Sequence, residues 1–363
     1  MAKYKMLRDS VEGLPNLELV EAPCATDSEL LMAHDPSYIQ DVLHGTLSEA
    51  QQKEIGFPWS AKMVERSRRS AGATIAACKA ALEEGIPLSS VWNGDTPKVY
   101  DDGIGRAYVV NNYGEQSMGD MSLLTAMEKS VNTIFVPLGM KAGLEKVVDV
   151  ARRAGVPDSV EMIAAPSVSL GAASPHVIDL ANAYATFAAQ GVYAKPFIIN
   201  EVQGPNKGIL YQGRIQAQEV FRKDVMADLT YALSRVTTSG TAAVVGSRVA
   251  RPTAGKTGTS NDNASAWFNG YTPEVAASVA FYRDDATQSL NGIGGLTSVT
   301  GGSFPARIWA EFVKGYLKNT PVQEFPAPAY IGGTEPINLI NAIPQMDPAL
   351  IPPSPSPTPK KKK

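Results

Sequence analysis

Three strand candidates that follow one another in the C-terminal half constrain the fold most. Residues 252–259, 264–271 and 275–282 are short runs rich in β-branched, aromatic or small apolar side chains. The second and third runs are joined by Thr272-Pro273-Glu274, which is short enough for a tight turn. These runs predict a compact sheet, so the chain needs helices or other strands to cover its faces.

Helical periodicity covers much of the remaining chain. Apolar residues recur at helical spacing, and Gly85 and Gly155 stand where two of these stretches end. The predicted helices span 62–84, 123–142, 144–154, 176–190, 223–236 and 306–316. Residues 91–113, rich in Gly, Asn and Asp, predict a loop over a cleft, and residues 192–212 predict a hairpin that turns at Gly204-Pro205-Asn206.

Composition excludes several classes of function. With 33 basic and 36 acidic side chains the net charge is −3, so the chain lacks the basic excess of a general nucleic-acid binder. The histidines His34, His44 and His176 are not clustered as a zinc site requires, and we expect no metal and no cofactor. Cys24 and Cys78 lie in segments with a helical pattern and are interpreted as buried thiols rather than a disulfide framework.

No stretch reaches the roughly 18 consecutive apolar residues of a membrane-spanning helix. The N-terminus also lacks the charged-then-apolar pattern of a signal peptide. We therefore expect a soluble chain, with the cytoplasm as one location open to it.

The strongest chemical motif is Lys256-Thr257-Gly258-Thr259, at the end of the first strand candidate. A lysine on a strand places a fixed cation beside a cleft, and the Thr257 hydroxyl and following backbone can hold an anionic group. Gly258 has no Cβ, so a substrate backbone can approach the strand closely. The same four residues also suit an ordinary strand end at the surface, and that alternative stays open for the motif alone.

A second motif, Ser130-Val131-Asn132, lies within the predicted helix 123–142. A serine and an asparagine two residues apart can both reach one cleft when the helix ends there. The Ser130 hydroxyl could then relay a proton, and the Asn132 amide could hold a substrate carbonyl. The signal is weak alone, since Ser289-Leu290-Asn291 is a second copy of the pattern.

In this order, the two motifs resemble the second and third motifs of penicillin-binding proteins and serine β-lactamases. The surroundings strengthen the resemblance, for example Ser169-Leu170-Gly171, Asn182-Ala183-Tyr184 and Ala266-Trp267-Phe268. Residues 86–335 thus resemble the transpeptidase domain of bifunctional (class A) penicillin-binding proteins, the actinobacterial ones especially. The resemblance implies an α/β (α+β) fold of the penicillin-binding protein and serine β-lactamase type, with an antiparallel sheet flanked by helices.

The resemblance also implies the roles of the site residues. Ser130 would relay protons and Asn132 would orient the substrate amide. Lys256 and Thr257 would bind a terminal carboxylate, with Gly258 beside them, and the Thr259 N–H would donate to the oxyanion. The implied ligands are a peptidoglycan stem peptide or a β-lactam, and the family acts at the outer face of the cell membrane behind an anchor that is not seen here.

The first motif of the family, Ser-x-x-Lys, is missing. No serine of the chain has a lysine three residues later. Counting back from Ala80-Ala81-Leu82-Glu83-Glu84-Gly85, the family serine falls at Ala71 and its lysine at Thr74. The nucleophile is therefore unknown, with Ser67 and Ser70 as neighbours that lack a positioned base, and we expect the transpeptidase to be inactive.

The segment before residue 86 resembles a different family. Stretches such as His34-Asp35-Pro36 and Gly56-Phe57-Pro58-Trp59 are similar to the first helices of bacterial histone-deacetylase-like enzymes. We expect three parts: a helical deacetylase-like appendage over 1–85, the transpeptidase domain over 86–335, and a disordered Pro/Lys-rich tail over 336–363. The alternatives to an enzyme are a non-catalytic β-lactam or D-Ala-D-Ala peptide-binding relic, a chimeric gene product, and a deacetylase-like protein without its metal site.

Overall fold

The computed structural model describes residues 71–102, 105–171, 175–260, 263–283 and 288–346. The segment predicted to be deacetylase-like, apart from residues 71–85, and the predicted tail beyond 346 lie outside these residues. The helices are α6 (Ala71–Glu83), α7 (Leu123–Lys129), α8 (Asn132–Ala142), α9 (Leu144–Ala154), α10 (Val177–Ala188), α11 (Lys223–Thr238), α12 (Ala243–Arg248) and α13 (Phe304–Tyr316). The strands are β1 (Val91–Asn93), β2 (Lys98–Asp101), β3 (Ala107–Val110), β4 (Asp120–Ser122), β5 (Val192–Ala194), β6 (Glu201–Gln203), β7 (Ile209–Gln212), β8 (Ala217–Glu219), β9 (Ala254–Thr259), β10 (Ser265–Tyr271) and β11 (Ala276–Tyr282).

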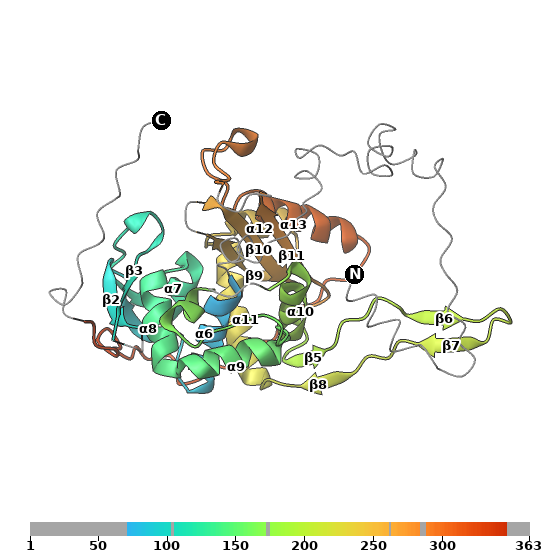
Figure 1. The fold of residues 1–363 in the computed structure, drawn as a ribbon, viewed down its shortest axis with the longest axis horizontal. Coiled ribbons are helices and arrows are strands. Elements are labelled where there is room, and N and C mark those ends of the chain that lie inside the picture. Colours follow the sequence, from blue (N-terminus) through green and yellow to red (C-terminus); the bar gives the residue numbers. More distant parts are fainter. Residues whose placement is uncertain (1–70, 103–104, 172–174, 261–262, 284–287, 347–363) are drawn as a thin grey trace, which may run out of the picture. The chain divides into compact units, whose positions relative to one another are not determined.

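The three strand candidates form one antiparallel sheet in the order β11-β10-β9, as predicted. Successive side chains of β10 point to opposite faces of the sheet. Helices pack against both faces. Phe268 of β10 packs edge-on against Trp309 of α13 at 5.3 Å between ring centroids. Tyr271, three residues later, meets Tyr184 of α10 at 6.2 Å and bonds to the Thr230 hydroxyl of α11 at 2.9 Å. The expected α/β fold, a sheet flanked by helices, is confirmed (Figure 1).

Helix α6 lies between α8, α9 and α11 at the centre of this body (Figure 1). The sequence predicts an apolar stripe along one side of the helix, but the structure buries it on all sides. Ile75, Cys78 and Leu82 are buried, and so are the alanines between them. Alanine makes this possible because its small side chain lets neighbouring helices approach closely. Burial also raises the pKa of the Cys78 thiol to about 12, so Cys78 is the buried thiol that the sequence predicts.

One predicted helix, 123–142, is wrong as a single element. The structure ends α7 at Lys129 and begins α8 at Asn132. Ser130 between them has φ 60° and ψ 52°, the left-handed conformation that closes a helix C-terminus. The break turns the chain at the second motif, which sequence periodicity could not show because apolar residues continue across it.

The region 91–113 is also more ordered than the predicted loop. Its residues form β1, β2 and β3, with β2 paired to β3 and β1 paired to β4. These strands are only three or four residues long, too short for a periodic signal. Farther along, β5 pairs with β8. Residues 196–215 belong to a separate unit and carry the β6–β7 hairpin, as predicted.

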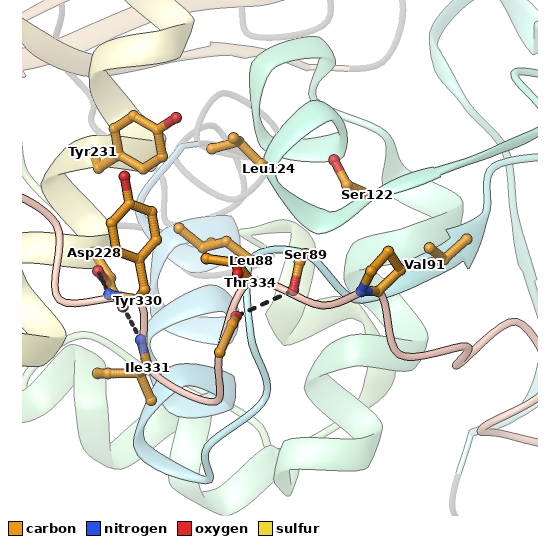
Figure 2. A pocket seen from close by; sticks show the side chains of 12 residues that line it. Leu88, Ser89, Val91, Ser122, Leu124, Asp228, Tyr231, Tyr330, Ile331 and Thr334 are labelled. Atoms are coloured by element: carbon orange, nitrogen blue, oxygen red, sulfur yellow. Dashed lines mark hydrogen bonds between the residues drawn. The ribbon is translucent and has the colours of Figure 1, made fainter.

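A pocket of about 370 Å³ lies where the chain after α13 crosses α11. Figure 2 shows Tyr231 and Tyr330 on one side of it and Leu88, Ser89 and Val91 on the other. At its edge the buried Asp228 carboxylate accepts three backbone N–H groups, from Ala329 at 2.7 Å, Tyr330 at 2.9 Å and Ile331 at 2.7 Å. Asp228 therefore fixes the segment 329–331 against α11. None of the residues of the two motifs lines this pocket.

Replacing Asp228 with alanine is expected to lower the free energy of unfolding by about 2–3 kcal/mol, because three N–H groups lose a charged acceptor. Denaturant unfolding measures the loss. Asp224 on the same helix is the matched control, since its side chain is 39% exposed and pairs with Arg222. Asp224→Ala should cost less than about 1 kcal/mol. Equal losses for the two variants would refute the role of Asp228.

Candidate functional site

Two motif residues that are 126 positions apart in the sequence meet in the structure. Lys256, on β9, places its Nζ 2.5 Å from the Oγ of Ser130, at the turn between α7 and α8. Lys256 also donates to the carbonyl of Thr257 at 3.0 Å. The structure therefore brings the two motifs into one site, as their resemblance implies.

The Lys256 side chain is almost completely buried, with 1% of the residue exposed. Burial disfavours the charged ammonium and lowers the pKa of Lys256 from 10.5 to about 7. No carboxylate of the described residues forms an ion pair with it, whereas Lys79 on α6 has Glu83 at 2.6 Å. Near neutral pH, Lys256 thus exists in comparable amounts as an ammonium and as a neutral amine.

Ser130 holds a left-handed backbone conformation that costs a non-glycine residue roughly 1 kcal/mol or more. The turn presents the half-buried Ser130 hydroxyl to Lys256, while the backbone N–H caps α7 through Ala126 and Met127. Residues strained in this way concentrate at functional sites. Val131, between Ser130 and Asn132, is fully buried and anchors the turn.

Asn132 and its neighbours are held by Asn111 and Asn112, two residues of the region 91–113 that the sequence analysis did not single out individually. The Asn132 amide donates to the carbonyl of Asn111 at 2.9 Å. The Asn112 side chain accepts from the backbone N–H and the hydroxyl of Thr133, both at 3.1 Å, and donates to the carbonyl of Gly94 at 2.8 Å. A pair of consecutive asparagines in a Gly-rich stretch was the available signal, since Asn side chains readily bond to nearby backbone.

The third motif continues along β9 beside the same site. The Thr257 hydroxyl shares a hydrogen bond with that of Thr241 at 2.7 Å, and Thr259 accepts from the Gly301 N–H at 3.2 Å. Gly301 approaches so closely that a Cβ there would lie 2.8 Å from the N and O of Gly258 and 2.2 Å from the Trp267 carbonyl. Sequence analysis missed Thr241 and Gly301, because only the fold brings them to β9.

A hydrogen bond joins two loops that are far apart in the sequence. The Tyr113 hydroxyl donates to the side chain of Asn263 at 3.1 Å, and Asn263 donates to that of Asn291 at 2.9 Å. Asn291 belongs to the second Ser-x-Asn copy, Ser289-Leu290-Asn291. That copy therefore lies in the loop network and makes no contact with Lys256 that resembles that of Ser130.

The position of the missing nucleophile lies at the start of α6. Ala71 is the first residue of the helix, and Thr74, where the family lysine would stand, is 7% exposed. The lysine of this helix, Lys79, is engaged elsewhere, because it pairs with Glu83 and lies 3.6 Å from the centroid of the Phe221 ring. Ser67 and Ser70 lie outside the described residues.

The described part of the chain has neither a cluster of metal-ligating side chains nor a helix that could span a membrane. No group of three or more His, Cys, Asp or Glu side chains there could hold a metal ion. No helix of that part has both the length and the apolar character to cross a bilayer.

Comparison with known proteins identifies the same kind of domain. The sequence model of one protein family, the penicillin-binding protein transpeptidase domain, matches residues 25–289. Penicillin-binding protein 1A of Mycolicibacterium smegmatis is 30% identical over 299 residues, which are 77% of this chain and 36% of that protein. Penicillin-binding protein 1A of Aquifex aeolicus is 29% identical over 248 residues, 68% of this chain and 33% of that protein. The chain thus spans about a third of the length of these relatives.

A solved structure agrees with the sequence matches. The PonA1 protein of Mycobacterium tuberculosis in complex with penicillin V shares 27% sequence identity and has a TM-score of 0.65, covering 77% of each chain. The family match begins at residue 25, not at the expected boundary of 86, so most of the segment compared above with deacetylases falls inside the matched range.

Proposed function

The chain belongs to the penicillin-binding protein transpeptidase family, and we propose that it binds D-Ala-D-Ala peptides and β-lactams without the family's catalytic turnover. The observation that carries the proposal is the contact between Ser130 and Lys256, which joins the second and third motifs. The ligand would be the stem peptide of peptidoglycan, or a β-lactam that mimics its end.

Each residue of the cleft has a proposed role that its surroundings support. A bound carboxylate would favour the ammonium form of Lys256 and raise its lowered pKa, so binding would take up a proton. The Thr257 hydroxyl would add a hydrogen bond to the same carboxylate. Asn132 would orient the substrate amide, and the Thr259 N–H would donate to the carbonyl oxygen.

Loss of turnover follows from the residues at the first turn of α6, where the family's serine and lysine would stand. Ala71 has no nucleophilic atom and Thr74 no amine, so the Ser-x-x-Lys route of the family is closed. Removal of a catalytic serine typically lowers kcat by about a millionfold.

We also propose that the chain divides at residue 85. In this proposal a chimeric gene joins a deacetylase-like segment to the transpeptidase part.

Reversible binding tests the proposal. An unreactive diacetyl-Lys-D-Ala-D-Ala peptide should bind with a Kd of about 1 mM, which corresponds to roughly −4 kcal/mol. NMR line broadening or calorimetry can measure this affinity. The matched peptide that ends in L-Ala-L-Ala should bind at least about tenfold more weakly, and Lys256→Met should weaken the D-Ala-D-Ala complex by about tenfold, because it removes a charged donor.

The proposal fails if the two stereoisomers bind equally. It also fails if Lys256→Met, shown to be folded, binds the D-Ala-D-Ala peptide as tightly as the parent does.

A further inference from the structure

We propose that Ser130 is itself the acyl acceptor of this cleft, with Lys256 as its general base, so that β-lactams acylate the chain slowly at Ser130. This inference rests on the proposed function, since the ligand must first bind in the cleft. It gives Ser130 a role as nucleophile that differs from the proton relay implied by its motif.

The geometry of the pair is that of a serine nucleophile and its base. The Ser130 Oγ and Lys256 Nζ are 2.5 Å apart, within the distance over which a proton passes directly. Among the described residues, the Ser130 hydroxyl has Lys256 as its hydrogen-bond partner. Ser130 is partly exposed, so its hydroxyl remains open to a ligand, while Lys256 is buried.

A base must hold its lone pair at the working pH, and the surroundings of Lys256 favour the neutral amine. Its polar contacts are the uncharged Ser130 hydroxyl and Thr257 carbonyl. Burial brings its pKa to about 7. Serine–lysine pairs are an established alternative to the serine–histidine–aspartate arrangement.

Several charged groups on the elements around β9 already have partners other than Lys256. On α7, Glu128 lies 3.5 Å from Arg235 of α11. On α6, Lys79 pairs with Glu83, and on α11 the Asp228 carboxylate accepts backbone N–H groups. The remaining titratable groups on these elements are Cys78, Lys129, Lys223, Asp224, Tyr231 and, on β10, Tyr271. None of the described groups forms an ion pair with Lys256 that would hold it in the ammonium form.

The reaction balances without any further reagent. In the fraction of complexes whose Lys256 is neutral, the Ser130 proton passes to the Lys256 amine as Oγ attacks the β-lactam carbonyl carbon. The C–N bond of the lactam ring then breaks, and the ring nitrogen takes the proton from Lys256. The product is an ester on Ser130 with Lys256 again neutral, so one lactam is consumed for each chain.

A fluorescent penicillin, incubated with the full chain and followed by peptide mapping, tests the inference. The label should appear on the tryptic peptide Ser130–Lys141. The second-order rate constant of labelling, which reports the protonation state of the free chain, should rise about tenfold from pH 6 to pH 8, as an amine with a pKa of about 7 loses its proton. Ser130→Ala should abolish the label, and Lys256→Met should slow it by about a hundredfold or more.

Matched controls separate a specific effect from misfolding. Ser289→Ala changes the second Ser-x-Asn copy and should leave labelling unchanged, as should Ser67→Ala combined with Ser70→Ala. Ser130→Ala must still bind the unreactive D-Ala-D-Ala peptide, which shows that its cleft is intact.

The possible outcomes distinguish the two proposals. A label on another peptide, or no label while the unreactive peptide still binds, overturns the role of Ser130 and leaves the proposed function standing. Absence of both labelling and peptide binding overturns the proposed function as well.

Discussion

Replacing Ala71 with serine and Thr74 with lysine is expected to accelerate acylation by penicillin on the order of a thousandfold or more. The two positions lie three residues apart in the first turn of α6, a spacing at which residues share one face of a helix. Helix α6 contacts β9, which carries Lys256, and the Lys256–Ser130 hydrogen bond joins the second and third motifs. The double variant would therefore supply the missing nucleophile and base to an existing cleft.

Fluorescent penicillin labelling followed by peptide mapping measures this gain, with the label expected at position 71. Ala71→Ser alone is the first control, because a serine without its lysine should react far more slowly. Thr74→Lys alone is the second control and tests whether a lysine is tolerated at this buried position. A folded double variant that gains no label at position 71 would show that the start of α6 does not face the cleft.

Replacing Lys256 with methionine is expected to raise the free energy of unfolding at pH 7 by about 2–4 kcal/mol. Burial lowers the Lys256 pKa from 10.5 to about 7 in the folded chain, and each unit corresponds to about 1.4 kcal/mol. The full penalty for holding this lysine in the fold is therefore on the order of 4 kcal/mol at pH 7. Loss of the hydrogen bond to Ser130 offsets part of the gain, by about 1–2 kcal/mol.

The gain should depend on pH in a defined direction. Between pH 7 and 10.5 the unfolded parent binds more protons at Lys256 than the folded parent does, so the stability of the parent rises with pH. Methionine does not titrate, so the advantage of Lys256→Met should be largest at and below pH 7 and should vanish above about pH 10.5. Lys129→Met, which changes an exposed lysine next to Ser130, should shift stability by less than about 0.5 kcal/mol at every pH.

Denaturant unfolding at pH 6, 7, 9 and 10.5 measures both variants. If Lys256→Met proves less stable than the parent at pH 7, the lysine is not held as a costly buried amine. A stabilising substitution that abolishes function would instead mean that the site is maintained at the expense of stability.

Sequence periodicity predicted the elements that are long and regular. The strands β9, β10 and β11, and the helices α9, α10, α11 and α13, lie within a few residues of the predicted ranges. It failed where local geometry interrupts a continuing apolar pattern. The turn at Ser130 is the clearest case, because nothing in Val131 or Asn132 announces a helix end.

The residues of the motifs were predictable, but their supports were not. Lys256 and Ser130 were found from their motifs, and the structure places them in contact. Asn112, Thr241 and Gly301 act through contacts that arise only when distant segments meet, and single side chains of these types carry no signal by themselves. The lowered pKa of Lys256 likewise depends on burial, which strand position alone could not give.

Titration of Lys256 by NMR distinguishes a buried amine from a solvated cation. With lysines labelled at the ε carbon with ¹³C, the NMR resonance that is missing from Lys256→Met belongs to this residue. We predict that this resonance titrates near pH 7 in the parent and shifts to a higher pKa when the unreactive D-Ala-D-Ala peptide binds. A Lys256 resonance that titrates near pH 10 in the free chain would contradict it, because Lys256 would then be a solvated cation and could not serve as the base of Ser130.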